Sequence, residues 1–270
     1  MAAEARLQKL EKYKEEIPGV EIEERQEGEI WISRIRITSP EGSKIIGRPE
    51  GTYVTIETER LRENDLDIHE KVIDILTQEL GKMLSPYKKK EVLVAGLGNR
   101  QVTADSLGPL TVEKVLTTRH VKETLPKELR KEMGTVSSLA PGVMGQTGIE
   151  TGEIIFSVVK GIHPAAVIAV DALAAASVER LNTTIQLCDT GICPGAGIGN
   201  RRQELSRKTL GIPVLAIGVP TVTDAGTSQE MYVTTKDMDA VVRRLSRVIA
   251  TAINRCVHHL EDRELEEYLY

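Results

Sequence analysis

Aromatic residues are scarce in this chain of 270 residues: they make up 3% of it, with one tryptophan and one phenylalanine. So few rings argue against the stacking platforms on which proteins bind single-stranded nucleic acid. The formal net charge of -5 likewise gives no basis for direct nucleic-acid binding. Three cysteines, Cys188, Cys193 and Cys256, are too few for a disulfide framework and fit a reducing compartment.

Long apolar runs are also missing. The longest, residues 165–170 and 212–219, are far shorter than the roughly 20 residues that a membrane-spanning helix needs. Residues 1–16 are charged throughout and hold no apolar segment typical of a secretory signal. We therefore expect a cytoplasmic protein with no membrane contact. Its 40% hydrophobic and 28% charged residues are ordinary for a globular protein with a real core.

The first third of the chain shows local signals for helices and strands. Residues 3–16 are typical of a short charged helix that ends before Pro18 and Gly19. Two strands are predicted at 30–37 and 52–57, with a turn at 39–42 between them. Apolar residues at helical spacing predict a helix over 67–84.

The rest of the chain alternates short apolar runs with helical segments. Strands are predicted at 91–95, 166–170, 184–187 and 213–217, with helices from about 106, over 172–180, and from about 236. This alternation favours a three-layer α/β fold, a mostly parallel sheet with helices on both faces. We expect a single domain over 1–270. It comprises an N-terminal helix and strand-pair extension (1–60), an α/β core (88–222) and a C-terminal helix (235–265).

Acidic residues follow each of the four later strands. They are Asp105, Asp171, Asp189 and Asp224. Ligands of open α/β sheets bind beyond the carboxyl ends of the strands, so three or four carboxylates are expected on one rim. Crowded carboxylates share protons, so one can activate water while another protonates a leaving amine.

Simpler interpretations stand beside this one. Asp105 and Asp171 each precede a predicted helix and could be N-caps, and Asp189 could form a turn. The same carboxylates could instead hold a divalent metal, with His163 as a further ligand. The Gly96–Asn99 loop lacks the third glycine of a dinucleotide fingerprint and the lysine of a phosphate loop. Residues 194–200 could form a backbone anion nest beside Arg201 and Arg202.

Several stretches, in this order, closely resemble the germination proteases of spore-forming bacteria. They include Gly96–Asn99, Thr103–Pro109, Ala140–Thr151, Ala169–Ala174, Asp189–Gly191, Gly199–Ser206 and Ile217–Val222. The resemblance covers roughly residues 20–225 and returns in the last helix. It implies a fold akin to the hydrogenase-maturation endopeptidases, a homotetramer, and no cofactor. It also implies degradation of small acid-soluble spore proteins in the spore core, by cleavage after acidic residues.

The family's two essential aspartates fall on Asp105 and Asp171, which we predict to be the acid–base pair. Asp189 is a candidate supporting carboxylate. Backbone N–H groups of two glycine-rich loops are candidates for binding the substrate or steadying the oxyanion. The supporting candidates are Gly96, Gly98, Asn99, Gly197, Gly199, Asn200 and Arg201.

Three departures from the family pattern qualify this prediction. The family's Asp-Leu-Ala-type processing motif is not found, which leaves regulation as a zymogen open. The region around 225–232 is shorter than in the family, and Cys193 stands where members of the family have histidine. The replacement by Cys193 argues against a required metal or acid–base histidine at that position. The alternatives are a metal-assisted peptidase using the same carboxylates and, because of the missing segments, a non-catalytic binding protein of the same fold.

Overall fold

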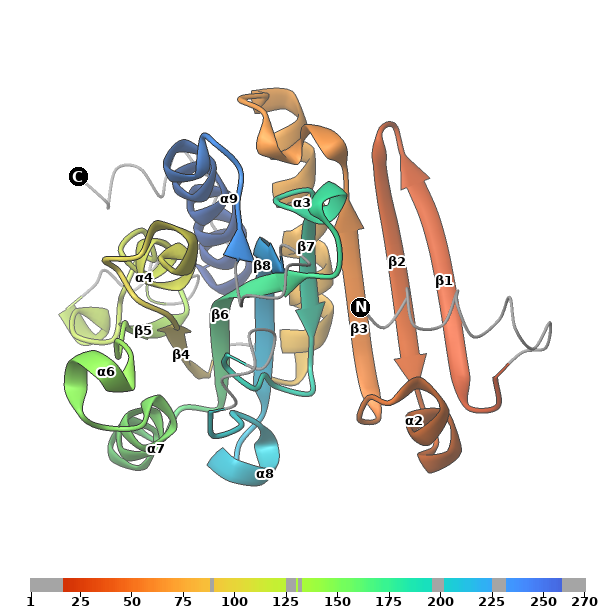
Figure 1. Ribbon diagram of the computed structural model, residues 1–270. Coiled ribbons are helices and arrows are strands. Elements are labelled where there is room, and N and C mark those ends of the chain that lie inside the picture. Colours follow the sequence, from red (N-terminus) through yellow and green to blue (C-terminus); the bar gives the residue numbers. More distant parts are fainter. Residues whose placement is uncertain are drawn as a thin grey trace.

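The structure is a computed structural model that describes residues 17–87, 90–124, 130, 133–195, 202–224 and 232–258. The helix expected at 3–16 lies outside these residues. A nine-stranded sheet runs through the molecule in the order β1-β2-β3-β7-β8-β6-β4-β5, with β9 paired to β8 (Figure 1). The α/β class predicted from the sequence is confirmed.

One half of the sheet is parallel and lies in the middle of the core. It consists of β4 (Glu91–Gly96), β5 (Thr135–Leu139), β6 (Ala166–Ala175) and β8 (Val214–Asp224). The strand interiors are continuous apolar runs, because helices cover both faces. The parallel strands predicted at 91–95, 166–170 and 213–217 are therefore present, each extended at its carboxyl end.

The other half of the sheet is antiparallel. It consists of β1 (Val20–Glu27), β2 (Ile30–Ile37), β3 (Gly51–Glu57), β7 (Thr184–Cys188) and the short β9 (Tyr232–Val233). The sheet is thus mixed rather than mostly parallel. The sequence analysis missed β1, whose eight residues are mostly charged and half-exposed at the edge of the sheet.

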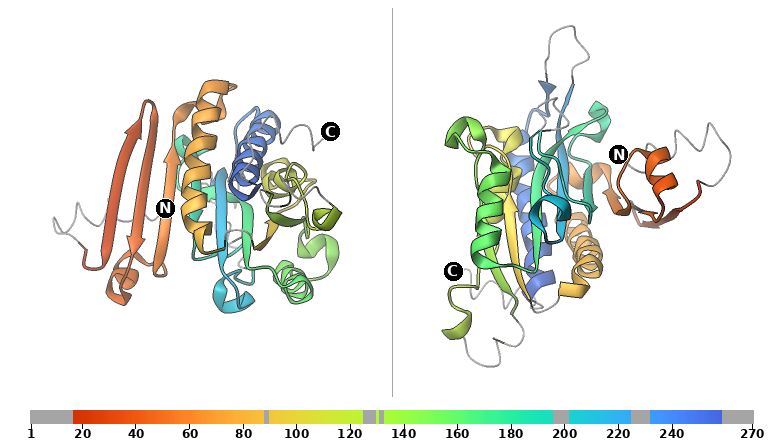
Figure 2. Two further views of the ribbon diagram at one scale, coloured as in Figure 1. Left: turned by 180° about the vertical axis from the view of Figure 1, so that it is seen from behind. Right: turned by 90° about the horizontal axis from the view of Figure 1, so that it is seen from below.

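Alternate residues of the parallel strands enter two separate apolar clusters. Val92 and Val94 of β4 face the cluster beneath α3 (Leu66–Leu84), α4 (Leu107–Val112) and α9 (Met238–His258). Leu93 and Ala95 face the cluster under α7 (Thr151–Ile162) and α8 (Arg207–Leu210). This alternation is consistent with the predicted three layers. Figure 2 shows α3 and α9 side by side against the sheet.

Two local predictions are wrong. The turn expected at 39–42 is the start of α2 (Pro40–Ile46), where the Ser39 side chain caps the helix and Pro40 occupies its first turn. The helix expected over 172–180 is a continuation of β6, followed by a single 3-10 turn at Val178–Arg180. Alanines favour helices, but pairing of 172–175 with β8 overrides that preference.

The remaining elements are short. α6 spans Met144–Thr147, and 3-10 turns lie at Glu59–Arg62, Ser85–Tyr87, Thr103–Asp105 and Lys122–Thr124. Among the residues described, no helix has both the length and the apolar character needed to cross a membrane.

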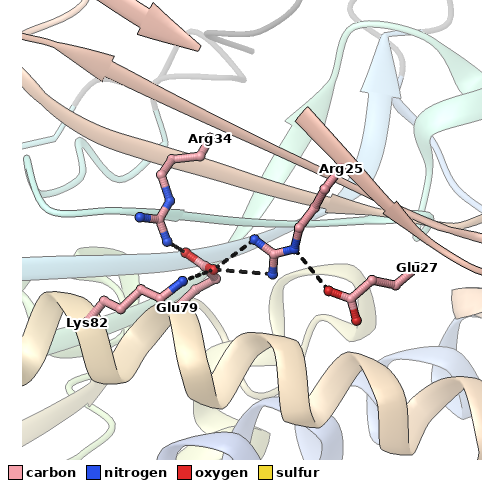
Figure 3. Close-up of polar contacts among 5 residues, drawn as sticks. All are labelled: Arg25, Glu27, Arg34, Glu79 and Lys82. Carbon is pink, nitrogen blue, oxygen red and sulfur yellow. Dashed lines mark hydrogen bonds and ion pairs between the residues drawn. The ribbon is translucent and has the colours of Figure 1, made fainter. Parts of the chain in front are cut away.

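The antiparallel half is joined to α3 by a cluster of charges around one buried carboxylate (Figure 3). The side chain of Glu79 in α3 is fully buried. Its carboxylate forms ion pairs with Arg25 of β1, Arg34 of β2 and Lys82 of the next helical turn. Arg25 also bonds Glu27, at 2.9 Å. Burial by itself would raise the pKa of Glu79, but the hydrogen bonds and charges of Lys82 and Arg34 outweigh it and lower that pKa.

Candidate active site

The loop after β4 approaches the neighbouring backbone so closely that glycine is required. A Cβ on Gly96 would lie 2.2 Å from the carbonyl oxygen of Gly108. Gly98 has φ +106, and a Cβ there would lie 2.1 Å from the carbonyl oxygen of Asp105. These two glycines therefore allow the loop to fold over the 3-10 turn that ends at Asp105.

This loop holds the Asp105 carboxylate. The N–H of Asn99 donates to its Oδ2 at 2.7 Å. Ser106, not Asp105, occupies the N-cap position of α4, so capping does not explain the aspartate. Burial raises the pKa of Asp105 above its usual value of 3.8, and the bond from Asn99 only partly opposes this.

Asp171 lies inside β6, opposite Gly218 of β8. No helix follows it directly, so it is not a helix cap. Asp171 is only 5% exposed, and its Oδ1 accepts a hydrogen bond from the N–H of Ala172 at 2.9 Å. Burial, followed by the charge of Asp105, raises the pKa of Asp171 to about 8.

The two aspartates therefore form an electrostatically coupled pair. The N–H of Leu97 donates to the carbonyl of Val170 at 2.8 Å, which brings the Asp105 segment against the strand that carries Asp171. A pair of this kind holds one proton between two carboxyls near neutral pH. Such a pair can accept a proton from water and return one to a leaving group.

A cavity of about 420 Å³ opens beside Asp105. Its walls are mostly apolar or small and come from the carboxyl ends of β6 and β8 and from β3 and β7. Asp105 is one of the residues that line it, and Asp171 is not. Arg48 and Tyr53, from the region expected to be a mere extension, also line it. The N-terminal strands thus complete the cleft.

The other two rim aspartates lie elsewhere. β7 runs antiparallel to β8. Its carboxyl end, which Asp189 follows, therefore lies at the level of the amino ends of the parallel strands. There Asp189 accepts from the N–H of Thr52 at 2.7 Å and fixes the start of β3. Asp224 is exposed, six residues beyond Gly218 along β8, which corresponds to roughly 20 Å of strand. Two carboxylates therefore converge, not three or four.

The remaining predicted site residues divide into two groups. Gly197, Gly199, Asn200 and Arg201 lie outside the described residues. In the first loop, the N–H groups of Leu97 and Asn99 already donate to Val170 and Asp105. The role observed for Gly96, Gly98 and Asn99 is therefore to shape the loop and hold Asp105.

His163, the histidine suggested for a metal site, is distant from the pair. It ends α7 in a left-handed conformation, before β6 begins, and so lies at the opposite end of that strand from Asp171. Within the described ranges, no cluster of three or more His, Cys, Asp or Glu side chains is arranged to hold a metal ion. None of the three cysteines, Cys188, Cys193 and Cys256, is joined in a disulfide.

Polar residues of the cleft that were not predicted from the sequence include Arg48, Tyr53 and Thr221. Tyr53 lies in β3 and Arg48 in the segment just before it, and the pairing of β3 with β7 brings both to the parallel core. No local pattern indicates this. Thr221 lies four residues beyond the strand predicted at 213–217 and within the stretch Ile217–Val222 that resembles the germination proteases.

The fold and this geometry define an α/β protein with two coupled carboxyls at the carboxyl ends of its parallel strands. Residues 1–230 match the sequence model of the family described as Peptidase_A25, germination protease. The chain belongs to the germination protease family.

Individual relatives agree with this assignment. The germination protease of Geobacillus sp. (strain WCH70) is 46% identical over 250 residues, covering 92% of this chain and 66% of that protein. The germination protease of Bacillus velezensis (strain DSM 23117 / BGSC 10A6 / LMG 26770 / FZB42) is 52% identical, covering 79% of this chain and 59% of that protein. The chain thus spans about two thirds or less of these relatives. The germination protease of Clostridium tetani (strain Massachusetts / E88) is 37% identical, covering 100% of this chain and 98% of that protein.

A solved structure is also similar in part. It is the [NiFe] hydrogenase maturation protease HycI from Thermococcus kodakarensis KOD1. The TM-score is 0.40 at 18% identity, over 64% of this chain and 97% of that one.

Proposed function

We propose that this protein is an endopeptidase in which Asp105 and Asp171 activate water. The observation that carries the proposal is Asp171, a buried carboxyl whose pKa is raised to about 8 beside a second carboxyl. At neutral pH Asp171 holds a proton and Asp105, which lines the cleft, is the base. Membership of the germination protease family supports peptide-bond hydrolysis as the reaction.

The proton balance of this mechanism closes. Asp105 takes a proton from water as the hydroxide oxygen bonds to the peptide carbonyl carbon. Asp171 supplies the proton that the nitrogen needs as the carbon–nitrogen bond breaks. Asp105 then passes its proton to Asp171, which restores the starting state of the pair.

The cleft also supports a preference for acidic substrates. Among its described lining residues, Arg48 is the one lysine or arginine, and Asp105 is the one carboxylate. In mostly apolar surroundings a guanidinium favours a partner carboxylate strongly. We therefore propose cleavage after acidic residues, with Arg48 contacting the acidic side chain.

The biological setting is proposed from the family. The substrates are small acid-soluble spore proteins, degraded in the cytoplasm of the germinating spore core. The active form is a homotetramer. Regulation as a zymogen belongs to the same set of family properties and has no support from the described residues.

Cleavage of a glutamate-containing peptide by the purified chain tests the proposal, with and without EDTA. Cleavage in both conditions supports the two-aspartate mechanism. Loss of cleavage on chelation, restored by a divalent ion, would favour a metal-assisted peptidase. Binding of the peptide without cleavage would instead indicate a non-catalytic member of the family.

A further inference from the structure

Asp105 lies at the end of a 3-10 turn, so its position depends on how the segment 97–106 is held. Several hydrogen bonds fold the segment on itself, among them one at Asp105 and one at Ser106. The Asn99 N–H donates to Asp105 Oδ2 at 2.7 Å, and Ser106 Oγ donates to the Thr103 carbonyl at 2.8 Å. Neither bond connects the segment to the strand that carries Asp171.

Two other hydrogen bonds among the described residues hold the segment against the sheet, one to β6, which carries Asp171, and one to the neighbouring strand β8. One joins the Leu97 N–H to the Val170 carbonyl at 2.8 Å. The other runs from Thr221 Oγ1 of β8 to the carbonyl of Ala104, the residue before Asp105, at 2.7 Å. Thr221 is 1% exposed, so this bond is shielded from competing water. The two bonds hold the segment at its start and beside its aspartate.

The backbone at Thr221 is irregular in a way that aims its side chain. Leu173 of β6 pairs with Pro220, and the next residue, Ala174, pairs with Val222. Thr221 is therefore the extra residue of a β-bulge between two parallel strands. Bulges are rare in parallel pairs, occur next to active sites and redirect a side chain. The Thr221 carbonyl accepts from Thr234 Oγ1 at 2.7 Å, which holds the bulge from its other side.

We propose that Thr221 is a positioning residue of the catalytic pair: its hydroxyl, aimed by the bulge, binds the Ala104 carbonyl and fixes Asp105 beside Asp171. This inference rests on the proposed function of the pair. Because Thr221 is buried, it acts on the substrate through Asp105.

Removal of the hydroxyl has a specific electrostatic consequence. Asp105 is the charged group that raises the pKa of Asp171, after burial. If Asp105 moves away, that contribution falls and the pKa of Asp171 decreases. The other titratable groups that line the cavity stay as they were. They are Arg48, Tyr53, Cys188, Cys193 and Tyr232.

Thr221→Val tests the proposal, because valine keeps the shape and removes the donor. We expect kcat to fall about tenfold or more, the scale of one lost hydrogen bond, with little change in KM. The basic limb of the kcat–pH profile should move to lower pH. Thr221→Ser keeps a hydroxyl and should retain most of the activity.

Thr223→Val is the matched control. Thr223 lies on the same strand, is 2% exposed, and donates to the Ala175 carbonyl at 3.1 Å, away from the pair. The Thr223→Val variant should lose about as much stability as Thr221→Val but keep the kcat–pH profile of the wild type. Equal effects of the two valine variants on kcat and on the pH profile would overturn the positioning role while leaving the proposed function intact.

A titration of the carboxyls separates the two hypotheses. Carbon NMR of labelled aspartates measures the pKa of Asp171 whether or not the protein cleaves peptide. If wild-type protein is inactive, the proposed function fails. A lower Asp171 pKa in Thr221→Val, but not in Thr223→Val, still supports the positioning role. An unchanged pKa overturns it, and Thr221→Ala replaces the valine variant if that one does not fold.

Discussion

Asp171 and Glu79 are both buried carboxyls, one in the parallel half of the sheet and one beneath the antiparallel half. The Glu79 carboxylate pairs with Arg25, Arg34 and Lys82, and the hydrogen bonds and charges of Lys82 and Arg34 lower its pKa (Figure 3). Asp171 has a second carboxyl as its charged neighbour, and its pKa is raised to about 8. Burial opposes ionisation in both, so the neighbouring charges decide the outcome.

The comparison separates a structural acid from a reactive one. Glu79 stays ionised and joins β1 and β2 to α3. Asp171 keeps its proton to near-neutral pH, and the proposed mechanism requires such a proton donor. Replacing Glu79 by its amide should therefore lower stability, whereas replacing Asp171 by its amide should lower activity.

The largest expected effect is on catalysis. Asp171→Asn keeps the size of the side chain but removes its ionisable proton, so activity should fall at least about a hundredfold. Asp105→Asn should do the same. Asp224→Asn, at an exposed position on β8, is the control and should cleave normally. Near-normal cleavage of a glutamate-containing peptide by either folded dyad variant would return that aspartate to a structural role.

The second effect is on folding. Glu79→Gln should lower the free energy of unfolding by about 1.5–3 kcal/mol, because the buried side chain loses its charge-assisted hydrogen bonds to Arg34 and Lys82. Glu27→Gln is its control: Glu27 pairs with Arg25 at the surface and should cost less than about 1 kcal/mol. Urea denaturation measures both. Equal losses would mean that the buried cluster contributes no more than a surface pair.

The third effect is on the pH dependence of stability. A folded pKa near 8 means that folded Asp171 retains its proton above the unfolded value of 3.8. Its contribution to stability is fully present below about pH 4 and is lost as pH rises through about 8, by roughly 1.4 kcal/mol per unit at most. Glu79, with a lowered pKa, contributes in the opposite sense, and its contribution is lost as pH falls through its folded pKa. Asp171→Asn should therefore gain stability relative to wild type between pH 5 and 8, and a constant difference across that range would contradict the raised pKa.

The smallest effect is on specificity. Arg48→Leu should reduce the preference for a glutamate peptide over its glutamine counterpart by roughly tenfold to a hundredfold, the scale of a charge-assisted hydrogen bond. Cleavage of the glutamine peptide should change little. An unchanged ratio of kcat/KM for the two peptides would remove Arg48 from substrate recognition.

The parallel core could be predicted from sequence because its strands are buried on both faces. Runs such as 91–95 and 166–170 are continuously apolar, so their existence and their following aspartates are visible locally. The prediction that three or four carboxylates share one rim assumed that the strands before them are parallel. β7 instead runs antiparallel, so Asp189 lies at the opposite end of the strands from Asp105 and Asp171. The direction of a strand depends on tertiary pairing, which no local pattern encodes.

The same limit applies to the antiparallel half. β1 alternates charged residues with a few apolar ones, so it was overlooked, although its Arg25 is one of the partners of Glu79. Arg48 approaches the cleft only through the pairing of β3 with β7. The single-domain organisation and the roles of the site residues remain predictions.

The protonation state of Asp171 tests the central claim most directly. Carbon NMR of aspartate-labelled protein, with Asp171→Asn to assign the signal, follows this carboxyl from pH 4 to 10. The account predicts that Asp171 is protonated at neutral pH and titrates at about 8. Titration near its ordinary value of 3.8 would contradict the account, because a carboxylate that is already ionised at neutral pH has no proton to give to the leaving amine.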